Sequence, residues 1–251
     1  MRVLALDTTT REGSVALVED GLVLVERRGD PSRTHAERLP RELLSLLEDR
    51  GLATSDVDLF AVASGPGSFT GLRIGIATVQ GLALVHRRRI AAISALDAAA
   101  HAAACELTKG ASIGVLMDAQ RHEVFSALYA IGEGPPFALD RVMEIEGPHV
   151  GDAAAVLARW AGVMGERAIT VVGDAALACA DAIGRRLPGA SVHAPSSLAG
   201  TIGCLAIAQS RAGTTIEPAA VRPLYVRRPD AEVDRERRNA PPWRTLRTQN
   251  P

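Results

Sequence analysis

The sequence predicts an α/β protein built from two similar halves, each with the element order β-β-β-α-β-α. Two observations support this prediction. Apolar runs of strand length alternate with longer segments in which apolar residues recur at helical spacing. The same order then begins again about a hundred residues further on, and each opening run, residues 3–6 and 112–117, ends in an aspartate, Asp7 or Asp118. A repeat this long is not a solenoid period, and we expect two α/β halves with a cleft between them.

The first half opens with three predicted strands, at residues 3–6, 14–18 and 22–27. Asp20-Gly21 between the last two is a strong hairpin signal. Thr34 begins a helix, because Glu37 three residues later completes a capping box. Pro40 is expected either to kink this helix or to mark its first turn. The half is completed by a strand at 59–63, a helix at 71–86, a short strand at 90–93 and an alanine-rich helix at 95–107.

The second half repeats the order. Its strands are predicted at residues 112–117, 124–130, 139–145 and 169–172, and its helices at 150–161, 175–183 and 198–211. These patterns divide the chain into an N-terminal half at 1–109 and a C-terminal half at 110–225. The last helix is free to cross back to the first half, so the boundary is approximate. Residues 226–251 form an arginine- and proline-rich tail, which is interpreted either as a solvated, flexible terminus or as a contact for RNA or a partner.

One stretch organises the chain: Ser64-Gly65-Pro66-Gly67-Ser68-Phe69-Thr70-Gly71-Leu72-Arg73. It lies between a buried strand and a helix, and its glycines stand where the backbone must bend sharply. Ser68 is a good N-cap for the helix, and Pro66 fixes the turn before it. The amides at the helix start are suited to an anion, although a tight turn with an ordinary cap explains the pattern equally well.

Composition excludes several classes of protein. Hydrophobic residues make up 47% of the chain but aromatic residues only 3%, so few side chains are available for stacking on bases. The net charge of −1 gives no general attraction for polyanions. Cys105, Cys179 and Cys204 are far apart and are expected to be buried free thiols. No apolar run is long enough to span a membrane and none resembles a signal peptide, so a cytoplasmic protein is expected.

The sequence resembles the TsaB (YeaZ) family, which acts in making threonylcarbamoyladenosine in tRNA. The resemblance runs from about residue 2 to residue 227. It rests on Leu4-Ala5-Leu6-Asp7-Thr8-Thr9, Thr34-His35-Ala36-Glu37-Arg38-Leu39-Pro40, Ser64 through Gly75, Asp118-Ala119-Gln120-Arg121 with Glu123-Val124-Phe125, and Pro223-Leu224-Tyr225. The Gly-Pro-Gly-Ser-Phe-Thr-Gly-Leu-Arg string is the specific part. The architecture likewise resembles the actin-like (ASKHA) fold.

The resemblance implies a non-catalytic subunit that dimerises with a TsaD-like transferase and supports its reaction. It also implies a TsaE-like ATPase in the assembly, a possible homodimer, and contact with tRNA only through the complex. ATP and Mg²⁺ would be used by the complex, with no cofactor assigned to this chain. The two N-terminal helices are the implied partner surface, with the contact residues Leu39, Leu43, Leu46, Gly71, Arg73, Gly75 and Thr78.

A nucleotide site is a further implication of the actin-like fold. Asp7, Thr8 and Thr9 stand where that fold turns its first strand toward phosphates, and Gly173-Asp174 is the matching position in the second half. An aspartate there can hold water or Mg²⁺, and threonine hydroxyls can face phosphate. The same residues can equally serve only to hydrogen-bond a tight turn. We expect a vestigial site with weak or absent nucleotide binding.

No catalytic residue or metal ligand is predicted. The related TsaD family carries a His-x-x-x-His metal pair shortly after the Gly-Pro-Gly stretch, whereas the segment here reads Ser94-Ala95-Leu96-Asp97-Ala98-Ala99. His101 stands alone and is expected on the helix surface. Ser68 is not in a Gly-x-Ser-x-Gly elbow. Two alternatives to the partner subunit remain: an actin-like-fold ATP-dependent small-molecule kinase, and a homodimeric scaffold.

Overall fold

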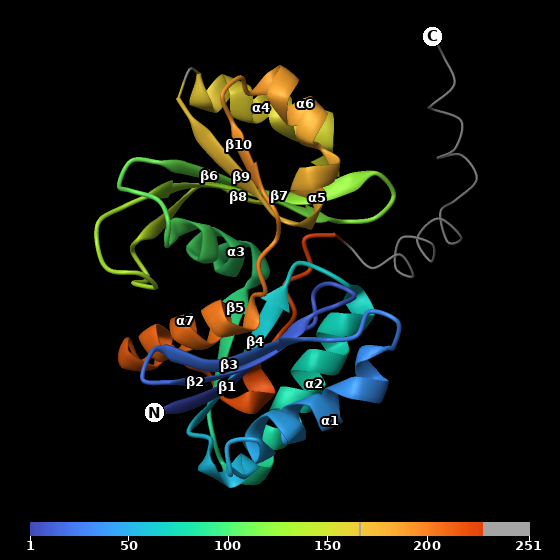
Figure 1. Ribbon diagram of the computed structural model, residues 1–251, viewed down its shortest axis with the longest axis vertical. Coiled ribbons are helices and arrows are strands. Elements are labelled where there is room, and N and C mark those ends of the chain that lie inside the picture. Colours follow the sequence, from blue (N-terminus) through green and yellow to red (C-terminus); the bar gives the residue numbers. More distant parts are fainter. Residues whose placement is uncertain (166, 228–251) are drawn as a thin grey trace, which may run out of the picture.

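A computed structural model describes residues 1–165 and 167–227 of the 251-residue chain (Figure 1). The first part contains β1 (Arg2–Asp7), β2 (Ser14–Glu19), β3 (Leu22–Arg28), α1 (His35–Glu48), the 3₁₀ turn η1 (Thr54–Asp56), β4 (Leu59–Gly65), α2 (Phe69–His86), β5 (Ile90–Ser94) and α3 (Ala95–Ala104). The rest contains β6 (Ser112–Asp118), β7 (Glu123–Ile131), β8 (Val142–Asp152), α4 (Ala153–Met164), β9 (Ile169–Val172), α5 (Asp174–Ala178), α6 (Ala180–Arg186), β10 (Ser191–His193), α7 (Ala199–Arg211) and η2 (Pro218–Ala220).

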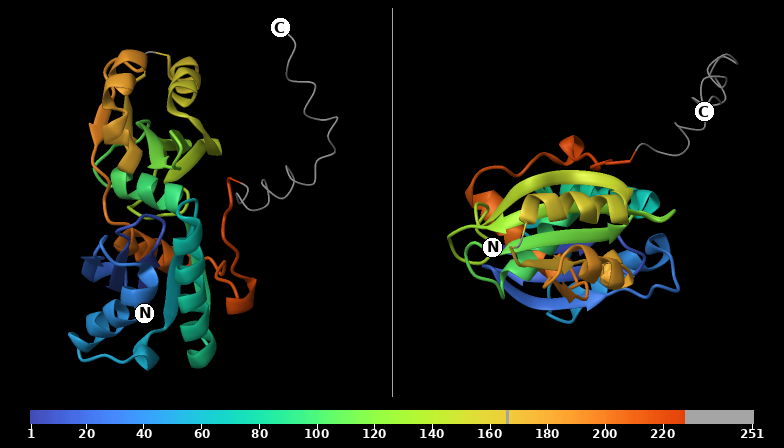
Figure 2. Two further views of the ribbon diagram at one scale, coloured as in Figure 1. Left: turned by 90° about the vertical axis from the view of Figure 1, so that its right-hand side faces the viewer. Right: turned by 90° about the horizontal axis from the view of Figure 1, so that it is seen from above.

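The two halves form two five-stranded sheets of the same topology. The strand orders are β3-β2-β1-β4-β5 and β10-β9-β6-β7-β8. In each sheet the opening strand pairs antiparallel with the next strand and parallel with the fourth. This equivalence confirms the duplicated β-β-β-α-β-α order. The two sheets stack as a first and a second lobe (Figures 1 and 2). Helices α1 and α2 cover the outer face of the first sheet, α4 to α6 cover the outer face of the second, and α3 and α7 lie between the sheets.

Several element boundaries differ from those predicted. The strand expected at 139–145 is β8, which runs on to Asp152, and its helix begins only at Ala153. The helix expected at 175–183 is broken at Cys179 into α5 and α6. Pro40 lies inside α1 rather than in its first turn, and the carboxylate of Glu37 accepts hydrogen bonds from the amide and hydroxyl of Thr34 at the cap.

The outer faces of the two sheets bury separate cores. On the first sheet, α1 and α2 cover a cluster that includes Leu4, Leu6 and Phe60. On the second sheet, α4 to α6 cover a cluster centred on the fully buried Trp160. Gly114 on β6 makes room for that indole, since a Cβ there would lie 2.4 Å from a ring carbon. Each lobe therefore has an apolar core on the side that faces away from the other lobe.

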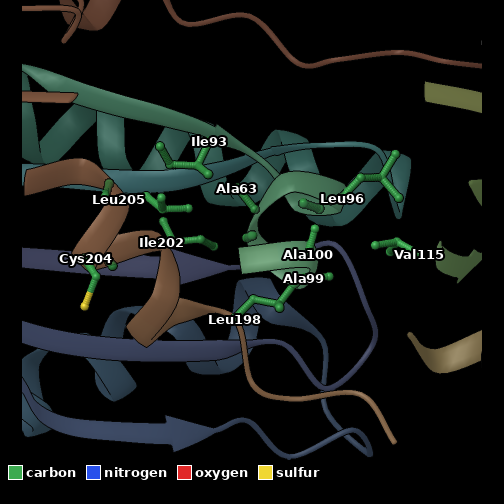
Figure 3. Close-up of a cluster of buried hydrophobic side chains, with 14 of the residues drawn as sticks. Ala63, Ile93, Leu96, Ala99, Ala100, Val115, Leu198, Ile202, Cys204 and Leu205 are labelled. Atoms are coloured by element: carbon green, nitrogen blue, oxygen red, sulfur yellow. The ribbon is translucent and has the colours of Figure 1, made fainter. Parts of the chain in front are cut away.

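A third core is shared by the lobes. It joins α3, α7 and the inner faces of both sheets, and Figure 3 shows Leu96 and Ala100 of α3 beside Ile202 and Leu205 of α7. Helix α7 packs on β1, β2 and β4, so the last helix returns to the first sheet. Gly203 allows this close approach, because a Cβ there would lie 2.4 Å from a methyl group of Val18.

The segment after α7 runs outside α2 toward the second lobe (Figure 2). The amide of Gln80 donates to Pro218 O at 2.7 Å, and the backbone N–H of Leu224 donates to Ser64 O at 2.7 Å. Arg227 then donates to Ala119 O of the second lobe at 2.7 Å and pairs with Glu123. Residues 222–227, which we call the strap, therefore connect the lobes. The predicted tail lies outside the described residues from 228 onward.

Two smaller findings bear on earlier expectations. Within the described part of the chain, no helix is both long and apolar enough to serve as a membrane-spanning segment.

All three cysteines are free thiols, but only Cys204 is buried, whereas Cys105 at the end of α3 is exposed. The expectation that all three thiols are buried was therefore wrong.

Candidate functional site

The predicted turn and helix start pack directly onto the loop that follows β1. A Cβ on Gly67 would lie 2.5 Å from Cβ of Thr9, and one on Gly71 would lie 2.1 Å from Thr8 O. A Cβ on Gly75 would lie 2.3 Å from the Thr8 hydroxyl oxygen. The glycines at four-residue spacing are thus required because the turn and the start of α2 touch the loop after β1 without space for side chains.

Backbone hydrogen bonds complete this junction. Ser68 N–H donates to Thr9 O at 2.7 Å, and the Ser68 hydroxyl accepts from Gly71 N–H at 3.2 Å. The predicted N-cap is therefore confirmed. The start of α2 is fixed against the loop on which Asp7, Thr8 and Thr9 lie.

Arg38 on α1 holds the other side of the same loop. Its guanidinium is buried, donates to both carboxylate oxygens of Glu42, and donates to the carbonyls of Arg11 and Glu12. It also bonds Nδ1 of His35, whose Nε2 lies 2.9 Å from Thr10 O. Burial lowers the pKa of His35, which favours the neutral ring. The family-like Thr-His-Ala-Glu-Arg string thus positions the loop after β1.

Asp7 and Asp174 approach one another across the lobes. Asp7 Oδ1 accepts from the amide of Thr9 at 2.8 Å and from its hydroxyl at 2.6 Å. Asp174 accepts from the amide of Asp118 at 2.8 Å. Burial raises the pKa of both carboxyls, and the charge of Asp174 adds to the rise at Asp7. Ionisation of Asp7 is therefore disfavoured by its burial first and by the charge of Asp174 second.

The cleft between the lobes contains two pockets. Asp7, Gly173 and Asp174 line a cavity of about 500 Å³, which we call the acidic pocket. Thr9 lines a second cavity of about 890 Å³, together with the start of α2 and the strap. We call the second cavity the arginine pocket, after Arg11, Arg33, Arg121 and Arg227 in its wall. Of the five predicted nucleotide-site residues, only Thr8 lines neither pocket, because it lies beneath α2.

Most residues of the predicted partner surface are not accessible to a partner in the isolated chain. Five of the seven residues are buried within the chain itself: Leu39, Leu43, Leu46, Gly71 and Gly75. The leucines pack in the core under α1, and the glycines face the loop after β1. Only Arg73 and Thr78 remain accessible. Helical spacing identifies one apolar face correctly, but that face meets the chain's own sheet.

The remaining titratable groups do not form a metal site. Among residues 1–165 and 167–227, no three His, Cys, Asp or Glu side chains are grouped so that they could hold an ion. His101, expected on the helix surface, is 5% exposed, and its Nδ1 has no hydrogen-bond partner. Burial and the charge of Arg141 lower its pKa to about 4. The nearby Tyr129 hydroxyl donates to Asp97 at 2.7 Å.

Sequence reasoning did not single out the arginines and aromatic rings around the larger pocket. Arg73 Nε donates to the Tyr225 hydroxyl at 3.2 Å, and the rings of Tyr225 and Phe69 stack with centroids 5.2 Å apart. These residues are far apart in the sequence, so no local spacing indicates that they meet. The sequence signals were the separate family-like stretches that contain Phe69 and Arg73, Arg121 and Phe125, and Tyr225.

Comparison with known proteins gives consistent matches. A family model described as "TsaD: tRNA N6-adenosine threonylcarbamoyltransferase" matches residues 30–155. The chain is similar to the tRNA threonylcarbamoyladenosine biosynthesis protein TsaB of Bacillus subtilis, with 31% identity over 167 residues that cover 66% of this chain and 67% of the relative. It is 39% identical over 131 residues to the Escherichia coli protein of the same name, covering 51% of this chain and 55% of that one.

Solved structures agree. The chain superposes on YeaZ from Pseudomonas aeruginosa with a TM-score of 0.67 and 28% identity, covering 89% of this chain and 99% of YeaZ. The activator of the 2-hydroxyisocaproyl-CoA dehydratase from Clostridium difficile aligns with a TM-score of 0.52 at 11% identity, covering 85% of this chain and 97% of the activator. The second likeness concerns the fold alone. Together with the duplicated sheets, these matches confirm the predicted actin-like α/β fold.

Proposed function

Because this chain belongs to the TsaB (YeaZ) family, whose named members take part in tRNA threonylcarbamoyladenosine biosynthesis, we propose that it is a subunit of that pathway. In this proposal the chain is non-catalytic and pairs with a TsaD-type transferase. The match of residues 30–155 to the TsaD family model supports a partner of related architecture. A TsaE-type ATPase completes the proposed assembly, and tRNA, ATP and Mg²⁺ are engaged by the complex.

The proposed pairing with a TsaD-type transferase rests on the residues that α2 exposes. Opposite the buried glycine side, α2 presents small and apolar residues at i, i+3, i+4, i+7 and i+11 positions: Ile74, Ala77, Thr78, Gly81 and Val85. Leu84 and Val85 at its C-terminal end are 62% and 76% exposed. Small residues let a second helix approach closely, and exposed apolar side chains are a recurrent mark of interfaces. We call Ile74, Ala77, Thr78, Gly81 and Val85 the α2 stripe.

The acidic pocket supports the non-catalytic assignment. The fold family implies a magnesium nucleotide near Asp7 and Gly173-Asp174, but this pocket is lined by four carboxylates and one arginine. One oxygen of Asp7 already accepts two hydrogen bonds from Thr9. Arg28 is the single Arg or Lys among the residues that line this pocket, so little positive charge from the chain is present to offset the negative charge of the phosphates. We therefore propose weak or absent nucleotide binding at Asp7, Thr8, Thr9, Gly173 and Asp174, which also disfavours the kinase alternative.

The pairing is tested by mixing the full chain with TsaD from the same source, followed by size exclusion with light scattering. Wild type is expected to form a stable complex. Ala77→Arg, in the middle of the α2 stripe, is expected to lose it, because a long charged side chain replaces an exposed methyl group at the seam. Ala158→Arg on α4 of the second lobe is the matched control, since Ala158 is also an exposed helical alanine.

Other outcomes discriminate the alternatives. If wild type forms no complex with TsaD but hydrolyses ATP alone, the kinase is correct. If the isolated chain has the mass of a dimer that Ala77→Arg dissociates, while TsaD does not bind, the homodimeric scaffold is correct. If wild type and Ala77→Arg formed the complex equally well, the α2 stripe would not be the surface that contacts TsaD.

A further inference from the structure

Apolar side chains are exposed near the start of β8. Met143 and Ile145 are 50% and 42% exposed and lie two residues apart on this strand. Helix α4 follows β8 directly and packs against it, with the indole N–H of Trp160 3.4 Å from a carboxylate oxygen of Glu146. Val163, three residues further along α4, is 40% exposed and lies toward the start of the strand. We call Met143, Ile145 and Val163 the β8 patch.

The strand that carries this patch also has a free edge. β8 pairs with β7 on one side and is the last strand of its sheet on the other. An edge strand with exposed apolar side chains is a surface on which a further segment of chain can dock. Glu146 is paired with Arg159, whereas no ion pair within residues 1–165 and 167–227 engages Asp140, just before the strand, or Glu144 on it. The β8 patch is therefore suited to a segment that combines apolar side chains with positive charge.

The C-terminal residues of this chain have that composition. Residues 237–251 contain four arginines and no aspartate or glutamate. Trp243 and Leu246 are the large apolar residues of this segment, and each is followed directly by an arginine, Arg244 or Arg247. Tryptophan and arginine are the residue types that most often anchor interfaces. The segment thus complements the β8 patch in both hydrophobicity and charge.

The place where the described chain ends puts the β8 patch within reach of this segment. Arg227 is paired with Glu123, the first residue of β7. Ala130 of the same strand pairs with Met143, so the patch is about 24 Å from Glu123 along the sheet. Residues 228–243 span up to about 50 Å when extended. The side chain of Trp243 can therefore reach the β8 patch.

From these observations we propose that residues 237–251 dock on the β8 patch of the same chain. The indole of Trp243 covers the exposed apolar side chains, and Arg244 and Arg247 lie against the two carboxylates. A second copy of the β8 patch fits less well as the occupant, because it would place the same carboxylates against one another. The arginines of the tail are then engaged within the chain instead of being available to RNA.

The test is acrylamide quenching of tryptophan fluorescence in the full chain. Trp160 and Trp243 are its two tryptophans, and Trp160 is 0% exposed, so the quenchable emission is that of Trp243. Its quenching constant is expected to be at least about threefold smaller than that of a synthetic peptide of residues 237–251, because docking shields the indole. Met143→Glu is expected to raise the constant to the value of the peptide, since a charge replaces an apolar contact. Leu177→Glu on α5 is the matched control at an apolar residue that is 53% exposed outside the patch, and it is expected to leave the constant unchanged.

The contribution of charge has its own variant. Glu144→Arg is expected to raise the quenching constant as well, because it places a positive charge against the arginines of the tail. The proposal is overturned if Trp243 is quenched in the wild type as in the free peptide, or if folded Met143→Glu keeps the wild-type constant. It is also overturned if protection requires a dimer that Met143→Glu dissociates, which would assign the tail to a second copy, or appears only when single-stranded RNA is added. Ala77→Arg is expected to keep the protection, so the docking and the pairing with TsaD are tested independently.

Discussion

The guanidinium carbon of Arg73 lies 3.9 Å from the centroid of the Phe69 ring, within cation–π distance. The same guanidinium donates to the hydroxyl of Tyr225 on the strap. Arg73 therefore connects the first turn of α2 to the segment that crosses between the lobes. The residue expected to anchor a partner is engaged within its own chain.

Arg73→Met is expected to loosen the strap. It removes the cation–π contact and the hydrogen bond to Tyr225, so amide hydrogen exchange at residues 222–227 should become faster. The free energy of unfolding should change by less than about 1 kcal/mol, because the contact is at the surface. Tyr225→Phe, which keeps the ring and deletes the hydroxyl, should show a smaller effect. Unchanged exchange in Arg73→Met would contradict this role.

Gly75→Ala is expected to destabilise the protein by about 2 kcal/mol, since the new methyl group would meet the buried Thr8 hydroxyl. Gly81→Ala is the matched control on the same helix. Nothing lies within 4 Å of a Cβ at Gly81, and alanine there should stabilise α2 by up to about 1 kcal/mol. Chemical denaturation measures both. Equal effects of the two substitutions would show that α2 does not pack on the loop as described.

Arg38→Met is expected to cost about 3 kcal/mol of unfolding free energy. It leaves the carboxylate of Glu42 and the carbonyls of Arg11 and Glu12 without their buried donor. Hydrogen exchange should rise over residues 8–13, because Arg38 fixes that loop. Arg41→Met, the same change at an exposed position of α1, should stay within about 0.5 kcal/mol of wild type. A loop that exchanges as slowly as in wild type would refute the positioning role.

The buried His101 predicts a loss of stability in mild acid. Its pKa of about 4 in the folded protein lies below the unfolded value of about 6.5, so the unfolded chain takes up the proton first. Its contribution is complete above pH 6.5 and is lost as the pH falls toward 4, by about 3 kcal/mol. Denaturant titrations at several pH values should show a flatter dependence for His101→Gln. Parallel profiles would mean that the histidine titrates normally.

Signals between residues that are close in the sequence predicted the helices, strands and caps, but they did not predict what packs against those elements. Strand runs, the Thr34–Glu37 cap and the Ser68 cap depend on neighbours in sequence, and the structure contains all of them. The three-residue strand β10 was missed because Ser191 and His193 are exposed and carry no apolar pattern. The repeat of element order indicated the duplication, because matching strand–helix units in one chain fold alike.

The site depended on contacts between distant residues. Apolar periodicity located the face of α1 that carries Leu39 and Leu43, but a periodic face does not reveal whether a sheet or a partner covers it. Gly71 and Gly75 likewise allow another segment to approach closely, but their spacing does not show which segment this is. The arginine pocket combines residues from six separate segments, so it becomes visible only once the lobes are in place.

The core that α3 and α7 share with both sheets determines how the molecule unfolds. Separating the lobes would expose Leu96, Ile202 and Val115 to water at the same time, so each lobe would keep its outer core but lose the apolar cover of its inner face. The protein should therefore unfold as one cooperative unit despite its two-lobed shape. In calorimetry this corresponds to a single heat-absorption peak whose van't Hoff and calorimetric enthalpies agree.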